Sequence, residues 1–111
     1  MDMREREVES HLGKLCEAAG LPIFKFVPDR APGMPDRIIC LPGERVCWVE
    51  TKKPKGGRVA ELQRYRHKVL REAGQRVEIV WTKEQAEALV AELSAEKRED
   101  RRERGAEKAP G

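Results

Sequence analysis

Residues 37 to 52 read RIICLPGERVCWVETK, in which two short apolar runs flank the segment PGER. The runs, Arg37–Leu41 and Val46–Thr51, contain the β-branched and other apolar residues that favour strands. A short connection with Pro and Gly between two such runs predicts an antiparallel β-hairpin. Both faces of the second run carry apolar residues, so this run is expected to be a central strand.

Helical and strand patterns continue on both sides of this hairpin. Further helices are expected at residues 4–19, at about 59–73 and from 82 to about 93, and further strands at 23–27 and 77–81. Gly20 and Gly74 end the first two helices, and Thr82 with Gln85 fits the capping-box pattern of the third. The apolar stripe expected of the second helix consists of Leu62, Val69, Leu70 and Ala73. The order α, β, β, β, α, β, α predicts an α/β fold, a mixed central sheet flanked by helices.

The chain length sets the domain organisation. A chain of 111 residues is long enough for one modest domain and too short for two independent ones. We expect this domain to span residues 1–93. Residues 94–111 are almost wholly charged or small, and they cannot bury enough surface to offset the entropy of ordering them. This tail is therefore expected to be frayed helix or disordered.

The cysteines and the apolar runs indicate the compartment. Cys16, Cys40 and Cys47 are odd in number, lie among apolar residues and show no CxxC spacing, so they are expected to be reduced core residues. No apolar run approaches membrane-spanning length, and the N-terminal residues do not resemble a signal peptide. These features predict a soluble, cytoplasmic protein with no membrane partner.

Basic residues gather in the second half of the predicted domain. The whole chain has 23 Lys and Arg against 20 Asp and Glu, so its net charge says little about partners. Between Lys52 and Arg76, however, the only acids are Glu61 and Glu72. A local positive surface of this kind attracts phosphates, although solvated basic helix faces are also common. The candidate contacts to DNA are Lys53, Lys55, Arg58 and Arg64.

Three charged residues lie where the predicted hairpin could bring them together. Side chains two apart on a strand share a face, so Glu50 and Lys52 point to one side, together with Trp48. Asp36 enters the neighbouring strand, whose geometry can bring its carboxylate close to that of Glu50. Two carboxylates held together repel unless a cation neutralises them, and such oxygen ligands suit Mg²⁺ or Mn²⁺.

Taken alone, each of these features has a simpler explanation. Glu50 and Lys52 could form an ordinary ion pair at a strand end, and Asp36 could be a turn residue. Both histidines, His11 and His67, are isolated in the sequence and are expected to lie on the surface.

The combination of motifs resembles a known family. G-x-P-D-R at Gly33–Arg37, followed by V-E-T-K at Val49–Lys52, resembles the VRR-NUC family of the PD-(D/E)XK nuclease superfamily. The resemblance covers roughly residues 5–93 and implies a restriction-endonuclease-like core. It further implies that Asp36, Glu50 and the main-chain carbonyl of Thr51 bind metal, that Lys52 is the catalytic lysine, and that Gln63 supports the site from its helix.

Members of this superfamily also tend to use a glutamate from the first helix, where this chain has Glu5, Glu7 and Glu9. Helical periodicity slightly favours Glu5, which lies near the centre of the apolar stripe. Similarity to archaeal Holliday-junction resolvases favours Glu9, because of its distance from Gly20. Glu9 is therefore the first choice, as a metal ligand either directly or through water, and Glu5 the reserve.

The resemblance implies a Mg²⁺-dependent endonuclease that hydrolyses DNA phosphodiesters, with Mn²⁺ able to substitute. Small VRR-NUC proteins suggest branched DNA such as Holliday junctions, and a viral or bacterial role in DNA repair and recombination. A homodimer would present two active sites to two strands. The alternatives are a noncatalytic DNA-binding module or nuclease subunit that depends on a partner, and a restriction-type duplex endonuclease.

Overall fold

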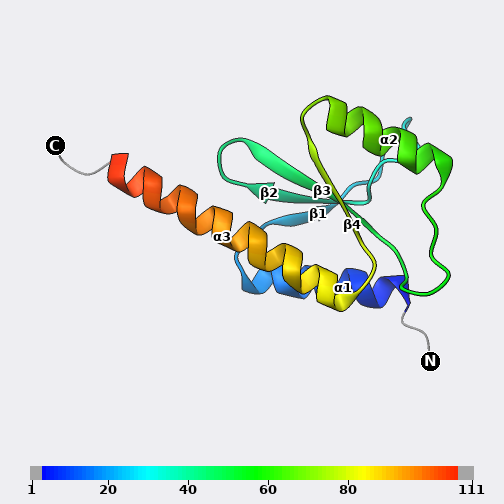
Figure 1. Cartoon of the computed structure of the whole chain (residues 1–111), viewed down its shortest axis with the longest axis horizontal. Coiled ribbons are helices and arrows are strands. Elements are labelled where there is room, and N and C mark those ends of the chain that lie inside the picture. Colours follow the sequence, from blue (N-terminus) through cyan, green and yellow to red (C-terminus); the bar gives the residue numbers. More distant parts are fainter. Residues whose placement is uncertain (1–3, 108–111) are drawn as a thin grey trace.

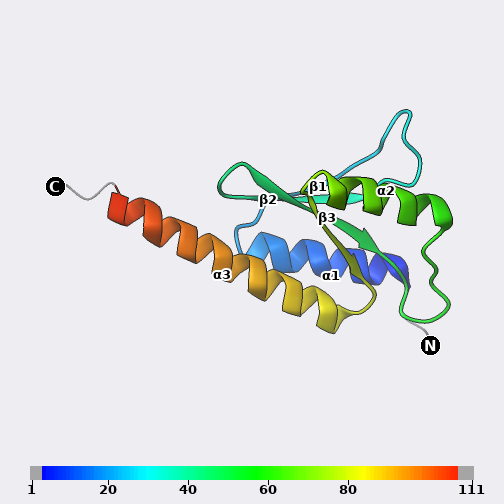
Figure 2. The same ribbon diagram turned by 45° about the horizontal axis from the view of Figure 1, so that its top comes forward.

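The computed structural model describes residues 4–107, which fold into one four-stranded sheet and three helices. In chain order the elements are α1 (Glu5–Ala18), β1 (Ile23–Lys25), β2 (Arg37–Leu41), β3 (Arg45–Thr51), α2 (Glu61–Glu72), β4 (Arg76–Val80) and α3 (Lys83–Glu107). The helices α1 and α3 lie side by side below the sheet in Figures 1 and 2, and α2 lies on the opposite side. The predicted order of elements is confirmed.

The sheet has the order β1-β2-β3-β4 and is mixed. The first two pairings are antiparallel, whereas β4 runs parallel to β3 because α2 carries the chain back across the sheet. In the hairpin Arg37 pairs with Val49, which places Asp36 beside the end of β3 at which Glu50 lies. The prediction that β3 is a central strand is confirmed.

The hydrophobic core lies between the sheet and the pair α1 and α3. Strand alternation points Ile39, Cys47 and Val49 to this side, where all three are fully buried. The helices contribute residues at helical spacing to the same core, which are Val8, Leu12 and Cys16 from α1 and Ala86, Leu89, Val90 and Leu93 from α3. This single core fixes α1 against the sheet and so positions the side chains of its first turns.

Helix α2 packs with a different face from the one that its apolar spacing predicted. Leu62 and Val69 are 42% and 41% exposed, whereas His67, which was expected on the surface, is only 2% exposed. The physical reason is the sheet face beneath α2, which holds the polar side chains of Glu50 and Lys52. The helix therefore turns its own polar side chains, and not its apolar ones, toward this part of the sheet.

The end of the chain also differs from the prediction. Instead of fraying near Ser94, the chain continues as α3 as far as Glu107, while residues 108–111 lie outside the described part. Two contacts hold the first part of this extension: Arg76 Nη1 donates to Glu96 at 3.0 Å, and Lys97 Nζ donates to the carbonyl of Gly20 at 2.5 Å. Beyond these contacts the helix projects past the sheet (Figure 1).

Smaller differences concern strand β1, the third helix start and the cysteines. The first strand ends at Lys25, although the amide of Phe26 still donates to the carbonyl of Asp36. At the start of α3, the amide of Gln85 donates to Thr82 Oγ1 as predicted, whereas the Gln85 side chain accepts from Trp81 N. All three cysteines are free thiols, of which Cys16 and Cys47 are buried and Cys40 is partly buried.

Within residues 4–107, no helix has the length and apolar character needed to cross a membrane.

Candidate active site

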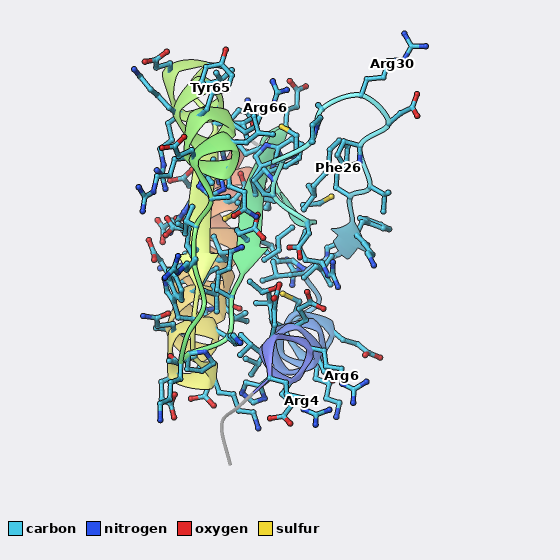
Figure 3. All side chains as sticks on the ribbon, turned by 90° about the vertical axis from the view of Figure 1, so that its right-hand side faces the viewer. Arg4, Arg6, Phe26, Arg30, Tyr65 and Arg66 are labelled. Atoms are coloured by element: carbon cyan, nitrogen blue, oxygen red, sulfur yellow. The ribbon has the colours of Figure 1, made fainter. Side chains whose placement is uncertain are left out.

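The site forms where β3 ends, beside the first turns of α1 and the start of α2. Figure 3 looks onto this end of the molecule, with Arg4 and Arg6 marking α1 on one side and Tyr65 and Arg66 marking α2 on the other. Side chains of β3 alternate between the two sides, so that Thr51 faces α1 and Glu50 faces α2. The strand end thus brings groups from both helices to one place.

Three carboxylates converge here, and that of Glu50 lies close enough to interact with them electrostatically. The carboxylate oxygens of Glu5, Glu9 and Asp36 lie within 4.8 Å of one another, and all three residues are partly buried. Glu50 is 4% exposed and interacts electrostatically with Asp36 and with both helical glutamates. The structure therefore places Glu5 and Glu9 together in the cluster, whereas Glu7 is exposed and outside it.

The clustering changes the acidity of two members. Burial and, next, the charge of Asp36 raise the pKa of Glu50 to about 7, against the opposing charge of Lys52. Burial also raises the pKa of Asp36 to about 6, opposed by Arg37 and reinforced by Glu9. Both carboxylates are therefore easier to protonate than exposed ones, which indicates that Arg37 and Lys52 only partly compensate the negative charge of the cluster.

Arg37 and Thr51 hold Glu9 in place. Arg37 Nη2 lies 3.2 Å from Glu9 Oε2, and the hydroxyl of the fully buried Thr51 donates to Glu9 Oε1 at 3.0 Å. Each carboxylate oxygen of Glu9 thus has a protein partner. Arg37 also lies 3.9 Å from Asp36, so it balances part of the negative charge.

Lys52 is held on the α2 side of the same strand end. Its Nζ donates to Gln63 Oε1 at 2.9 Å and lies 3.9 Å from Glu50 Oε2. Gln63 Oε1 also accepts from the main-chain N–H of Ala60 at 2.9 Å, which caps the start of α2. Gln63 therefore connects the position of the helix to the position of the Lys52 ammonium group.

His67 is a member of this site that the sequence reasoning missed. Its Nε2 lies 4.0 Å from Glu50 Oε1, and both atoms are buried without a hydrogen-bond partner among the described residues. Burial lowers the pKa of His67, and the charges of Arg71 and Lys52 lower it further. The signal available in the sequence was the spacing of four from Gln63, which places both side chains on one face of α2.

The four candidate DNA contacts follow Lys52 along the chain and are all exposed; they are Lys53, Lys55, Arg58 and Arg64. Two of them, Arg58 and Arg64, line a pocket on the α2 side of the strand end together with His67. In Figure 3 the labelled Arg6 projects outward from α1, and Arg30 projects outward from the loop that follows β1. Acidic groups in the centre and basic groups around them suit a phosphate backbone near a bound cation.

The donor set at the centre fits a divalent metal ion. Asp36 Oδ1 and Glu50 Oε1 are buried oxygens that have no hydrogen-bond partner within residues 4–107, which is costly unless a cation binds them. The ligands on offer are all hard oxygens, as Mg²⁺ and Mn²⁺ prefer. The residues that could hold such an ion are Asp36, Glu50, Glu5 and Glu9, and the resemblance implies the carbonyl of Thr51 as a further ligand.

Comparison with known proteins gives two matches. A solved structure described as a "VRR_NUC domain" superposes with a TM-score of 0.72 and 26% sequence identity, covering 78% of this chain and 94% of that one. A protein of Acyrthosiphon pisum secondary endosymbiont phage 1 named "Putative nuclease p44" is 36% identical over 52 residues. That alignment covers 47% of this chain and 56% of the phage protein, so it spans about half the length of each. No family model matches the chain.

The structural match extends over nearly the whole of the solved domain and over more than three quarters of this chain. The predicted restriction-endonuclease-like architecture, the PD-(D/E)XK core, is confirmed by this match. Together with the phage relative, the superposition establishes the resemblance that the G-x-P-D-R and V-E-T-K motifs suggested. In fold and in these motifs, the chain resembles the VRR-NUC family.

Proposed function

We propose that this protein is a metal-dependent DNA endonuclease that hydrolyses phosphodiester bonds. The observation that carries the proposal is the carboxylate cluster at the end of β3, where the Lys52 ammonium group lies 3.9 Å from Glu50 and is held by Gln63. A purely structural ion pair would not need buried carboxylate oxygens without partners at Asp36 and Glu50. The named relative and the matched domain support the same reaction class.

The carboxylates would hold Mg²⁺, or Mn²⁺ in its place, and the ion would supply Lewis acidity and a bound water of lowered pKa. Asp36 and Glu50 would bind it from the two strands and Glu9 or Glu5 from α1, directly or through water, beside the carbonyl of Thr51.

Lys52 is suited to act on the phosphate or on the attacking water. An ammonium group has three N–H donors, and Lys52 uses one of them on Gln63. The others can orient the water and stabilise negative charge on the phosphate as it develops. The water oxygen forms a bond to phosphorus, one ester P–O bond breaks, and the departing sugar oxygen takes up a proton.

The preferred substrate in this proposal is branched DNA, including Holliday junctions, in repair or recombination. Within residues 4–107, most of the chain belongs to the sheet and the helices, which leaves little of this part for elements that read a base sequence. We also propose a homodimer, because two copies would offer one site to each of two strands. Light scattering at micromolar concentration tests this, and a monomer that cuts junctions fully would contradict it.

The test is a cleavage assay with linear, flap, splayed and four-way DNA in Mg²⁺ and in EDTA. We expect Lys52→Ala and Asp36→Ala to lower the rate by roughly 10²–10³-fold. The matched controls are Lys68→Ala and Asp29→Ala, whose side chains are 75% and 97% exposed. Equal cleavage by variants and controls would refute the catalytic assignment, and absence of cleavage by the wild type would favour a partner-dependent subunit.

A further inference from the structure

A pocket of about 560 Å³ opens between α2 and the edge strand β4. Its cationic lining comes from Arg58, Arg64 and Arg71, and its apolar lining includes Ile79 and the ring of Trp81. This volume lies within the range of protein pockets that take small organic ligands. The pocket therefore combines guanidinium groups for an anion with an aromatic surface for a flat ring.

The three arginines are not paired with acidic side chains in the described part of the chain. Within residues 4–107, no carboxylate lies within ion-pair distance of Arg58, Arg64 or Arg71, and Arg71 donates to the main-chain carbonyl of Val77 at 2.9 Å. By contrast, Arg76 on the other side of β4 contacts three glutamates. Guanidinium groups gathered without counter-ions attract phosphate, which they can also bind in a bidentate manner.

The pocket adjoins the candidate active site through His67 and Ile79. His67 lines the pocket, and its unpartnered Nε2 lies 4.0 Å from Glu50 Oε1. Ile79 is the register partner of Glu50 on the neighbouring strand. Only the buried side chain of His67 therefore separates the pocket from the carboxylate of Glu50 in the candidate metal site. A part of the DNA substrate that binds in the pocket would lie next to the phosphodiester bond that is cut.

We propose that this pocket binds one unpaired nucleotide of the DNA substrate. The phosphate contacts the three arginines, and the base lies against Trp81 and Ile79. This inference rests on the proposed nuclease function and defines its substrate further. A base in intact duplex is stacked and paired, so only a base that has left the stack can place its face on Trp81. The pocket thereby selects DNA with single-stranded nucleotides near the cleavage site.

The test measures equilibrium binding in EDTA, so that no cleavage enters the result. The probes are a fluorescently labelled single-stranded oligonucleotide and a blunt duplex of equal length. The double variant Arg58→Gln/Arg64→Gln is compared with Lys68→Gln/Arg98→Gln, which removes two exposed charges outside the pocket. We expect about tenfold weaker single-strand binding for the pocket variant and a change within about twofold for the control.

Two further readouts distinguish the pocket from general charge. For single-strand binding, the slope of log K against log salt should become shallower by about 0.7 for each phosphate that the variant no longer neutralises. Trp81→Leu, which keeps an apolar side chain but removes the ring, should weaken single-strand binding on the order of tenfold and duplex binding much less.

Equal losses in the pocket and control variants, or equal losses for single strand and duplex, would overturn the proposal, as would absence of single-strand binding by the wild type. A protein that cuts DNA but shows none of this selectivity would refute the pocket alone. A protein that shows the selectivity without cutting would refute the nuclease function alone.

Discussion

Glu50→Gln should make the metal-free protein more stable while abolishing its activity. Burial raises the pKa of Glu50 from an ordinary 4.5 to about 7, and the charge of Asp36 contributes. In the folded state, therefore, the ionised carboxylate is disfavoured relative to the unfolded chain. Replacing it with a neutral amide of nearly the same shape removes this electrostatic cost.

The size of the effect follows from proton linkage. Because the folded pKa is the higher one, the stability contribution is fully present below about pH 4 and is lost as the pH rises through about 7. At 1.36 kcal/mol per pKa unit, the loss is less than about 1 kcal/mol at pH 5 and about 3 kcal/mol at pH 8. We expect Glu50→Gln to recover this energy at the higher pH.

The assay is urea unfolding in EDTA at about pH 5 and about pH 8. Glu103→Gln, which removes an exposed glutamate from α3, is the matched control and should change the free energy of unfolding by less than about 0.5 kcal/mol. Added Mg²⁺ should stabilise the wild type at pH 8, since a ligand that binds only the folded state raises its stability. The same addition should stabilise Glu50→Gln much less.

Two results would contradict this reasoning. One is that Glu50→Gln is less stable than the wild type at pH 8 in EDTA, which would mean that the carboxylate is already well compensated by protein groups. The other is a stability difference between variant and wild type that does not change between pH 5 and pH 8. Either outcome would remove the electrostatic case for a cation at the carboxylate cluster.

Three further substitutions test the surroundings of the site. Gln63→Ala removes the acceptor that holds Lys52, so single-turnover cleavage should slow roughly 10–100-fold while DNA binding in EDTA stays unchanged. An equally large loss of DNA binding would contradict a positioning role for Gln63. Gly33→Ala adds a Cβ 2.8 Å from Leu62 Cγ at a residue whose φ is +89°, so the free energy of unfolding should fall by about 1–3 kcal/mol in thermal unfolding. An unchanged Tm would refute the close approach of Gly33 to Leu62. Arg76→Gln breaks contacts to three glutamates and should lower the free energy of unfolding in urea by about 1 kcal/mol at low salt. This difference in stability from the wild type should shrink in high salt. A difference that does not change with salt would argue against an electrostatic origin.

Local patterns in the sequence determined most of the architecture. Strand alternation predicted which side of β3 carries Glu50 and Lys52, and hairpin geometry predicted that Asp36 would lie near them. Both follow from the backbone of a few neighbouring residues and from turn chemistry, which do not depend on distant contacts. The periodicity of α1 likewise identified the face that packs on the sheet.

The first-helix glutamate shows where local patterns end. Periodicity favoured Glu5 and resemblance favoured Glu9, and the structure brings both to Asp36. A helix places residues four apart one above the other, so two glutamates can reach one point when the helix passes close to it. That closeness depends on how α1 packs against the sheet, which no spacing within α1 specifies.

Tertiary structure alone decided three features: the face that α2 presents, the burial of His67 and the length of α3. Apolar spacing indicates which helix face could be buried, but the chemistry of the facing surface determines which one is. Beneath α2 that surface holds the charged Glu50 and Lys52, so Gln63 and His67 turn inward and Leu62 and Val69 remain exposed. In α3, contacts from Arg76 and Lys97 order turns that have no apolar stripe. The sequence by itself determined the strand-end residues of the site, whereas the packing of distant segments determined which groups surround them.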